Sequence, residues 1–111
     1  MDITVSTMKR ATLIEVSGRV DSTNATQLGE ALSTQIEAGH HLLVADLSRV
    51  EYISSAGLRE LVTAVKKARK TAGGDLRLAS LNDRVRDVLT LAGLDTVFQI
   101  YPTPVEAVGS Y

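Results

Sequence analysis

The sequence predicts one α/β domain, spanning residues 1–111, with a mixed β-sheet of about five strands and four helices. The expected order of elements is β-β-α-β-α-β-α-β-α. Two observations lead to this fold class. Short apolar or alternating segments are separated by longer segments whose apolar residues recur at helical spacing. Strands separated by helices need crossover connections, which favour parallel pairing, whereas only Lys9-Arg10 joins the first two strands, as in an antiparallel hairpin.

Five segments have the pattern of strands. Residues 3–8 and 12–17 alternate apolar and polar side chains, which is typical of strands with one buried face. Residues 42–47 begin with four apolar residues and predict a central strand that is covered on both faces. The shorter segments 76–79 and 97–101 complete the sheet. We expect loops between these strands and the helices that follow them.

Four segments carry apolar residues on one helical face, and each begins at a residue that can cap a helix. The second helix is expected over about 56–71, with Lys66 and Lys67 near its C-terminus, where the helix dipole favours cations. Gly39 lies where the first helix should end in a residue of positive φ. The expected N-caps of the other three helices are Asn24 in a capping box with Gln27, Ser80 or Asn82, and Thr103 in a capping box with Glu106.

Composition excludes several classes of function. Hydrophobic residues make up 44% and charged residues 23% of the chain, so an ordinary folded core is expected. A net charge of −1 gives no reason to expect direct binding to nucleic acid. The chain has no cysteine, which excludes disulfides, thiolate metal sites and cysteine nucleophiles. No signal peptide and no apolar run long enough for a membrane span are visible, so we expect a cytoplasmic protein.

The sequence also gives little support for catalysis. The two histidines, His40 and His41, are adjacent in a predicted turn, and neighbouring residues rarely converge on one metal ion or one substrate atom. Neither a Gly-x-Ser-x-Gly nucleophile elbow nor a phosphate-binding Gly-x-x-x-x-Gly-Lys-Ser/Thr loop is present. We therefore expect no catalytic residues, no metal site and no cofactor, and do not expect an enzyme.

The most informative segment is residues 46–59, where the central strand leads through a polar loop, 48–54, into the second helix. Two serines, Ser54 and Ser55, stand where this helix begins. A hydroxyl at this position meets unpaired N–H groups and the positive end of the helix dipole. It can serve as an ordinary N-cap, or it can carry a phosphate that the helix start stabilises. The residues alone leave both interpretations open.

Several segments together resemble one known family. They are the turn 18–21, the segment 46–58, the pair Gly73-Gly74 before a strand, and Leu91-Ala92-Gly93-Leu94. These segments and the order of elements resemble the STAS domain, most closely that of the bacterial anti-sigma factor antagonists. The resemblance implies a partner switch. In that family the unmodified antagonist binds an anti-sigma factor, often a serine kinase, and so releases a sigma factor; a PP2C-type phosphatase reverses the phosphorylation.

The resemblance also implies particular site residues. The family pattern Asp-Ser-Ser/Thr-Gly-Leu places the phosphoacceptor at Ser55, with Ser54 here in place of the usual Asp and Ala56 in place of Ser or Thr. We expect the turn after the second strand to reach the same sheet edge as Ser54. The expected partner-binding residues are Asp21, Ser22, Asp46, Ser54, Ala56, Gly57 and Leu58.

Two further possibilities stay open. The departures at positions 54 and 56 fit a STAS scaffold or transporter-accessory module that is not phosphorylated. Its constitutive docking patch would then include Tyr52, Ile53 and Leu58. Separately, the strand over 3–8 could form a weak homodimer if it lies at a sheet edge, although the adjacent Lys9-Arg10 would oppose this.

Overall fold

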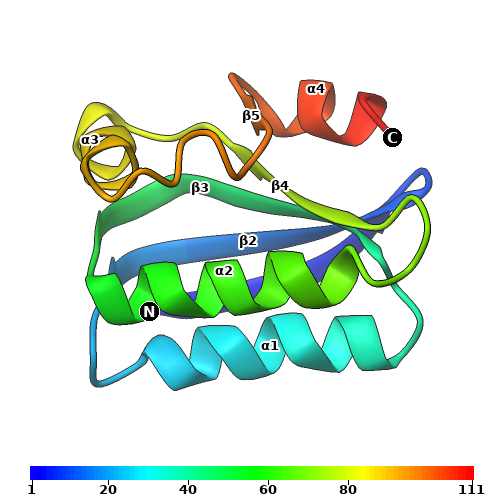
Figure 1. The fold of residues 1–111 in the computed structure, drawn as a ribbon, viewed down its shortest axis with the longest axis horizontal. Helices are drawn as coiled ribbons and strands as arrows, with labels where there is room; N and C mark the ends of the chain where they lie inside the picture. The colour runs from blue at the N-terminus through cyan, green and yellow to red at the C-terminus, as the bar shows by residue number, and fades with distance from the viewer.

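The computed structural model describes all 111 residues, and it confirms the α/β fold class and the order of elements (Figure 1). The nine elements are β1 (Asp2–Met8), β2 (Ala11–Val20), α1 (Ala25–Glu37), β3 (Leu42–Ile53), α2 (Ser55–Ala68), β4 (Asp75–Ala79), α3 (Asp83–Leu91), β5 (Ile100–Tyr101) and α4 (Pro104–Gly109).

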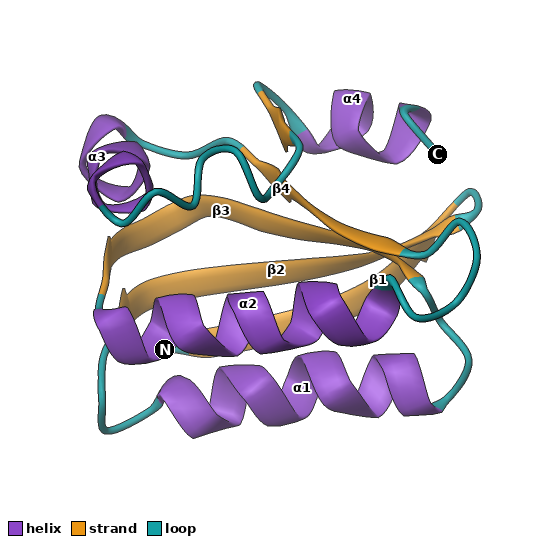
Figure 2. Ribbon diagram, viewed as in Figure 1, coloured by secondary structure: helices purple, strands orange, loops and turns teal.

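The strands form one mixed sheet in the order β1-β2-β3-β4-β5. β1 pairs with β2 in antiparallel fashion through the two-residue turn Lys9-Arg10, and all other pairs are parallel. Helices α1, α2 and α3 contribute to the large core on one face of the sheet, while α4 covers part of the other face (Figure 2). The parallel strands β2 and β3 therefore end at the same edge, close to the start of α2.

Branched aliphatic side chains build the core, as expected from a chain with 4% aromatic residues and no tryptophan. The large cluster joins the inward side chains of β2 and β3, such as Ile14 and Leu43, to Leu28 of α1 and Leu61 of α2. A smaller cluster lies beneath α4, where Val108 packs near Val44. Burial of these side chains supplies the main driving force for folding.

The strands β2 and β3 are longer than the sequence pattern predicts. The segments 18–20 and 48–53, expected as loops, pair with each other as strands. Two register shifts explain the difference, because each inserts an extra residue into β3 and breaks the alternation of apolar and polar side chains. Val50 and Ile53 thus return to the buried face after Ser48 and Arg49 have both been exposed.

The N-caps agree only in part with the prediction. Asn82 caps α3 and Thr103 caps α4, each accepting a hydrogen bond from the backbone N–H three residues later. The Asn24–Gln27 capping box is wrong. The Asn24 side chain faces the preceding turn instead, where its Oδ1 accepts from the Asp21 N–H at 2.9 Å and its Nδ2 donates to the Arg19 carbonyl. Gly39 does have the expected positive φ, 95°, just beyond α1.

The last strand is shorter than the predicted 97–101 and contains only Ile100 and Tyr101. Tertiary contacts hold the residues before it in a different conformation. Phe98 is buried in the large core, and Arg69 donates from Nη2 to the Val97 carbonyl at 2.7 Å. Burial of the Phe98 ring and the hydrogen bond from Arg69 to the Val97 carbonyl therefore outweigh strand propensity here.

A polar network ties α2 to β4 and the C-terminal residue. The buried Asp75 carboxylate accepts from Arg69 Nε at 2.9 Å and from Arg77 Nε at 3.2 Å. The Arg77 guanidinium lies over the Tyr111 ring, 4.0 Å from its centroid. The Tyr111 hydroxyl donates to the Leu43 and Asp75 carbonyls, 2.6 and 2.9 Å away. Burial and the Asp75 charge raise the pKa of Tyr111.

Candidate functional site

The start of α2 assigns different roles to the two adjacent serines. Ser54, in an extended conformation, is the N-cap, and its Oγ accepts from the Gly57 N–H at 3.3 Å. The Ser54 N–H donates to the Val20 carbonyl at 2.8 Å, which fixes the cap against the end of β2. Of the two interpretations of Ser55, the ordinary N-cap is therefore wrong, because Ser54 already fills that position.

Ser55 is the first residue of α2 and is exposed to solvent. The N–H groups of Ser55 and Ala56 lie in the first turn, before any helical carbonyl can accept them. No acidic residue stands in this turn to offset the positive end of the dipole, whereas Lys66 and Lys67 complement the negative end. The Ser55 hydroxyl, which does not cap the helix, thus lies beside backbone amide donors. The helix dipole at this end favours a negatively charged group.

Gly57 and Leu58 face the core rather than the surface. A Cβ atom on Gly57 would lie 2.7 Å from both Ile53 Cγ1 and Val20 Cγ1, so glycine lets α2 approach the sheet ends closely. Leu58 is 5% exposed and belongs to the large core. Neither can offer a side chain to a partner, which corrects their place among the expected partner-binding residues. They position Ser55 instead.

The turn after β2 reaches the same edge, as expected. The Asp21 carboxylate accepts from the backbone N–H and the hydroxyl of Thr23, and the neighbouring Ser22 is exposed. These hydrogen bonds, led by the Thr23 hydroxyl and supported by the charge of Arg19, lower the pKa of Asp21. Asp21 is therefore ionised at neutral pH, and the rim beside α2 carries a fixed negative charge.

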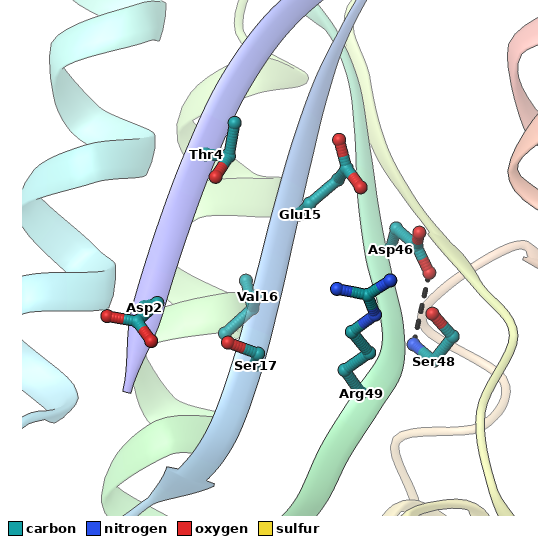
Figure 3. A pocket seen from close by; sticks show the side chains of 8 residues that line it. All are labelled: Asp2, Thr4, Glu15, Val16, Ser17, Asp46, Ser48 and Arg49. Carbon is teal, nitrogen blue, oxygen red and sulfur yellow. Dashed lines mark hydrogen bonds between the residues drawn. The ribbon is translucent and has the colours of Figure 1, made fainter.

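Asp46 does not lie with this group. It occupies the middle of β3, and residues 47–53 of the strand separate it from Ser54. Its Oδ1 accepts from the Ser48 N–H at 3.0 Å beside the first register shift. Figure 3 shows it on the sheet face near Glu15 and Arg49, lining a shallow hollow of about 70 Å³. Asp46 thus supports the irregular strand and does not flank Ser55.

Two basic residues near this end of the sheet, Arg19 and Arg59, were not predicted from the sequence. Arg19 and Tyr52 are register partners on β2 and β3, and the guanidinium lies 4.8 Å from the ring centroid. Their pairing could not be predicted without knowing the two register shifts. Arg59 is exposed one helical turn after Ser55, and the spacing of four residues could have revealed it.

The docking patch expected for a constitutive scaffold is not formed as predicted. Ile53 and Leu58 are buried, and Tyr52 is half-buried beside Arg19. The exposed surface at the start of α2 is polar, with Ser22, Ser55 and Arg59 as its members. None of the three surface hollows is lined by residues 54–59, so the site is an open surface, suited to a protein rather than a small molecule.

The histidines lie at the other end of the sheet. His40 and His41 precede β3, and the full length of that strand separates them from Ser54 and Ser55. A Ser-His pair cannot form at this distance. No cluster of three or more His, Asp or Glu side chains could hold a metal ion. None of the helices combines the length and apolar character needed to cross a bilayer.

Comparison with known proteins agrees with this arrangement. The family model of the STAS domain matches residues 2–107. BtrV of Bordetella bronchiseptica, whose name proposes an anti-sigma factor antagonist, is 35% identical over 100 residues, covering 90% of this chain and 85% of BtrV. The anti-sigma-B factor antagonist of Bacillus subtilis is 31% identical over 87 residues, 78% of each chain. The crystal structure of an anti-sigma factor antagonist from Mycobacterium paratuberculosis superposes with a TM-score of 0.90 at 28% identity, covering 98% of this chain and 92% of that one.

The chain belongs to the STAS domain family. Within that family its relatives are the anti-sigma factor antagonists, which are regulatory proteins and not enzymes.

Proposed function

We propose that this protein is the switchable component of a partner switch. In the unmodified form it binds an anti-sigma factor through the surface at the start of α2 and so releases a sigma factor. The anti-sigma factor is also a serine kinase that phosphorylates Ser55 and thereby ends the complex. A PP2C-type phosphatase removes the phosphate and restores binding. This exchange would take place in the cytoplasm, where the transcription machinery works.

One observation carries the proposal: the Ser55 hydroxyl is exposed at the first position of α2 while Ser54 supplies the cap. A capping hydroxyl could not be modified without loss of a helix-stabilising hydrogen bond. Ser55 has no such role, so a kinase can modify it and a phosphatase can reach it without disturbing the fold. Tyr52 and Arg19 on the adjacent strands form the rim that a partner would meet.

Phosphorylation at this place changes the charge but should preserve the domain. It adds about −1.5 to −2 charges and three strong acceptor oxygens. The free amides of the first turn and the helix dipole favour such a group. Arg59, four residues later on the helix, has the spacing and direction of a stabilising ion pair with it.

The cost therefore falls on the complex with the partner. A surface that fits a small hydroxyl would have to bury and desolvate a doubly charged group. Mispairing one buried charge at an interface costs about 2–5 kcal/mol. At about 1.4 kcal/mol for each tenfold change, binding weakens by roughly 30- to several-thousand-fold. A change of this size is sufficient for a regulatory switch.

The test combines phosphate mapping with binding. The protein is incubated with its cognate anti-sigma factor and ATP, and the modified residue is identified by mass spectrometry. Ser55→Asp should lower the affinity for the anti-sigma factor by 30-fold or more. Ser55→Asn introduces a neutral side chain of the same shape as Asp, and its affinity should stay close to that of the wild type. Phosphate on another residue, or equal affinity of the two variants, would contradict the proposal.

The alternative is a STAS scaffold or transporter-accessory module that is not phosphorylated. Ser54 and Ala56, which stand where the family pattern has Asp and Ser or Thr, favour it. Pull-downs from the source organism with wild type and Ser55→Asp distinguish the two functions. A partner retained equally by both proteins would support the scaffold, and a histidine-kinase-like ATPase lost from the variant would support the switch.

A further inference from the structure

We propose that the outer edge of β1 pairs with β1 of a second copy of this chain. The two strands would run antiparallel about a two-fold axis at Val5 and join two five-stranded sheets into one. The occupant of this edge is thus the protein itself. The proposal is independent of the function of Ser55, because α2 packs over strands further inside the sheet.

β1 exposes one side of its backbone. It is the outermost strand, with β2 as its neighbour on one side only. Met8 and Ala11 flank the two-residue turn and form a hydrogen-bonded pair, so Thr4 and Ser6 also bond to β2 by alternation. Ile3, Val5 and Thr7 therefore direct their N–H and C=O groups away from the sheet, where a further strand can accept them.

This edge lacks the charged residues and prolines that usually protect an edge strand against pairing. Residues 3–8 contain no charged residue and no proline, although 23% of the chain is charged. Lys9 and Arg10, expected to oppose association, lie in the turn beyond the strand, where Lys9 has a φ of 56°. The opposite edge differs, because β5 has only two residues and leads directly into α4.

The helix beside this edge is also free of charge on the flank that faces outward. α1 lies on the β1 side of α2 (Figure 1). Both of its glutamates are directed toward α2: Glu30 lines a hollow shared with α2, and Glu37 pairs with Lys67 at 3.1 Å. The opposite flank, by helical spacing, carries Gln27, Ala31, Thr34, Gln35 and Ala38. Two copies of this flank can approach without bringing like charges together.

The residues of β1 are complementary to those of a second copy in the antiparallel register centred on Val5. With Val5 opposite its symmetry mate, Ile3 faces Thr7 of the second copy, and about six backbone hydrogen bonds form, two for each of three pairs. Val5 is 41% exposed on the side of the sheet that the helices cover, and Val5 of the second copy would bury it. Asp2 of each copy then lies beside the Lys9-Arg10 turn of the other, so opposite charges meet at both ends.

The experiment is sedimentation analysis from low micromolar to millimolar concentration. The weight-average mass of the wild type should rise toward twice the monomer mass. Val5→Lys should raise the dissociation constant at least tenfold, because like charges face each other at the axis. The matched control is Val105→Lys on α4, a 66% exposed valine on the other side of the sheet, which should associate like the wild type.

A mixture of two oppositely charged variants distinguishes loss of the contact from misfolding. Val5→Lys and Val5→Glu should each be monomeric alone and should form a heterodimer when mixed, because only a two-fold contact at Val5 places the new charges opposite each other. A wild type that stays monomeric at millimolar concentration overturns the proposal. So does a Val5→Lys protein that associates as the wild type does, or a mixture that shows no heterodimer.

Discussion

Replacing Ser54 with alanine removes the side-chain oxygen that accepts from the Gly57 N–H at the start of α2. Loss of an N-cap of this kind costs about 0.5–2 kcal/mol. The distance of 3.3 Å is longer than the usual 2.9–3.0 Å, so we expect a loss in the lower half of that range, about 0.5–1 kcal/mol. For a domain of this size, that corresponds to a decrease in Tm of about 2–4 °C.

Urea unfolding followed by circular dichroism measures this loss as a lower midpoint with an unchanged m value. Ser55→Ala is the matched control, because it makes the same Ser-to-Ala change at the next residue. Ser55 is exposed and caps nothing, so its unfolding free energy should stay within about 0.5 kcal/mol of the wild type. If Ser55→Ala loses as much stability as Ser54→Ala, the division of roles between the two serines is wrong.

Three further predictions concern Asp75, Gly57 and Tyr111. Asp75→Ala leaves the largely buried Arg77 without its carboxylate and should cost about 3 kcal/mol of unfolding free energy, whereas Glu37→Ala, which breaks an exposed pair, should change it little. Gly57→Val forces atoms against Val20 and Ile53, so urea unfolding should show a loss of about 2–3 kcal/mol, and partner affinity should fall as well. The pKa of Tyr111 is raised on folding, so its hydroxyl stabilises the fold fully below the unfolded pKa of about 10 and loses this effect as pH rises further. The stability difference between the wild type and Tyr111→Phe, measured in urea from pH 8 to 11, should therefore shrink above pH 10; a constant difference would contradict the assignment.

Apolar periodicity was sufficient to predict the architecture. The alternation over 3–8 and 12–17, the apolar start of 42–47 and the helical stripes between them determine which faces are buried. The connection lengths then determine the direction of pairing, since a two-residue turn permits an antiparallel hairpin and a helix favours a parallel crossover. These patterns are local, and the structure follows them closely.

The length of β3 could not be predicted in the same way. Its two register shifts place Ser48 and Arg49, and later Glu51 and Tyr52, outside the alternation, so the strand has the pattern of a loop. Only pairing with the end of β2 satisfies the backbone of these residues. That pairing is a tertiary event with no signal in either segment alone.

The candidate site shows the same limit. The family pattern places the proposed phosphoacceptor at Ser55, but the choice of cap between two adjacent serines depends on where the chain turns from β3 into α2. The inward orientation of Leu58 follows from the helical stripe, yet the resemblance placed it at the interface. Asp46 was misplaced because its strand was expected to end nearby, and it continues to Ile53.

The close approach that Gly57 permits has a consequence for recognition. The first turn of α2 rests directly on Val20 and Ile53, so the backbone that carries the Ser55 hydroxyl is held against the buried core. A partner that docks there would not have to order a mobile loop, and little conformational entropy would be lost on association. Affinity would then depend on how exactly two preformed surfaces match, and a packing change deep beneath the helix could tune signalling without altering any exposed residue.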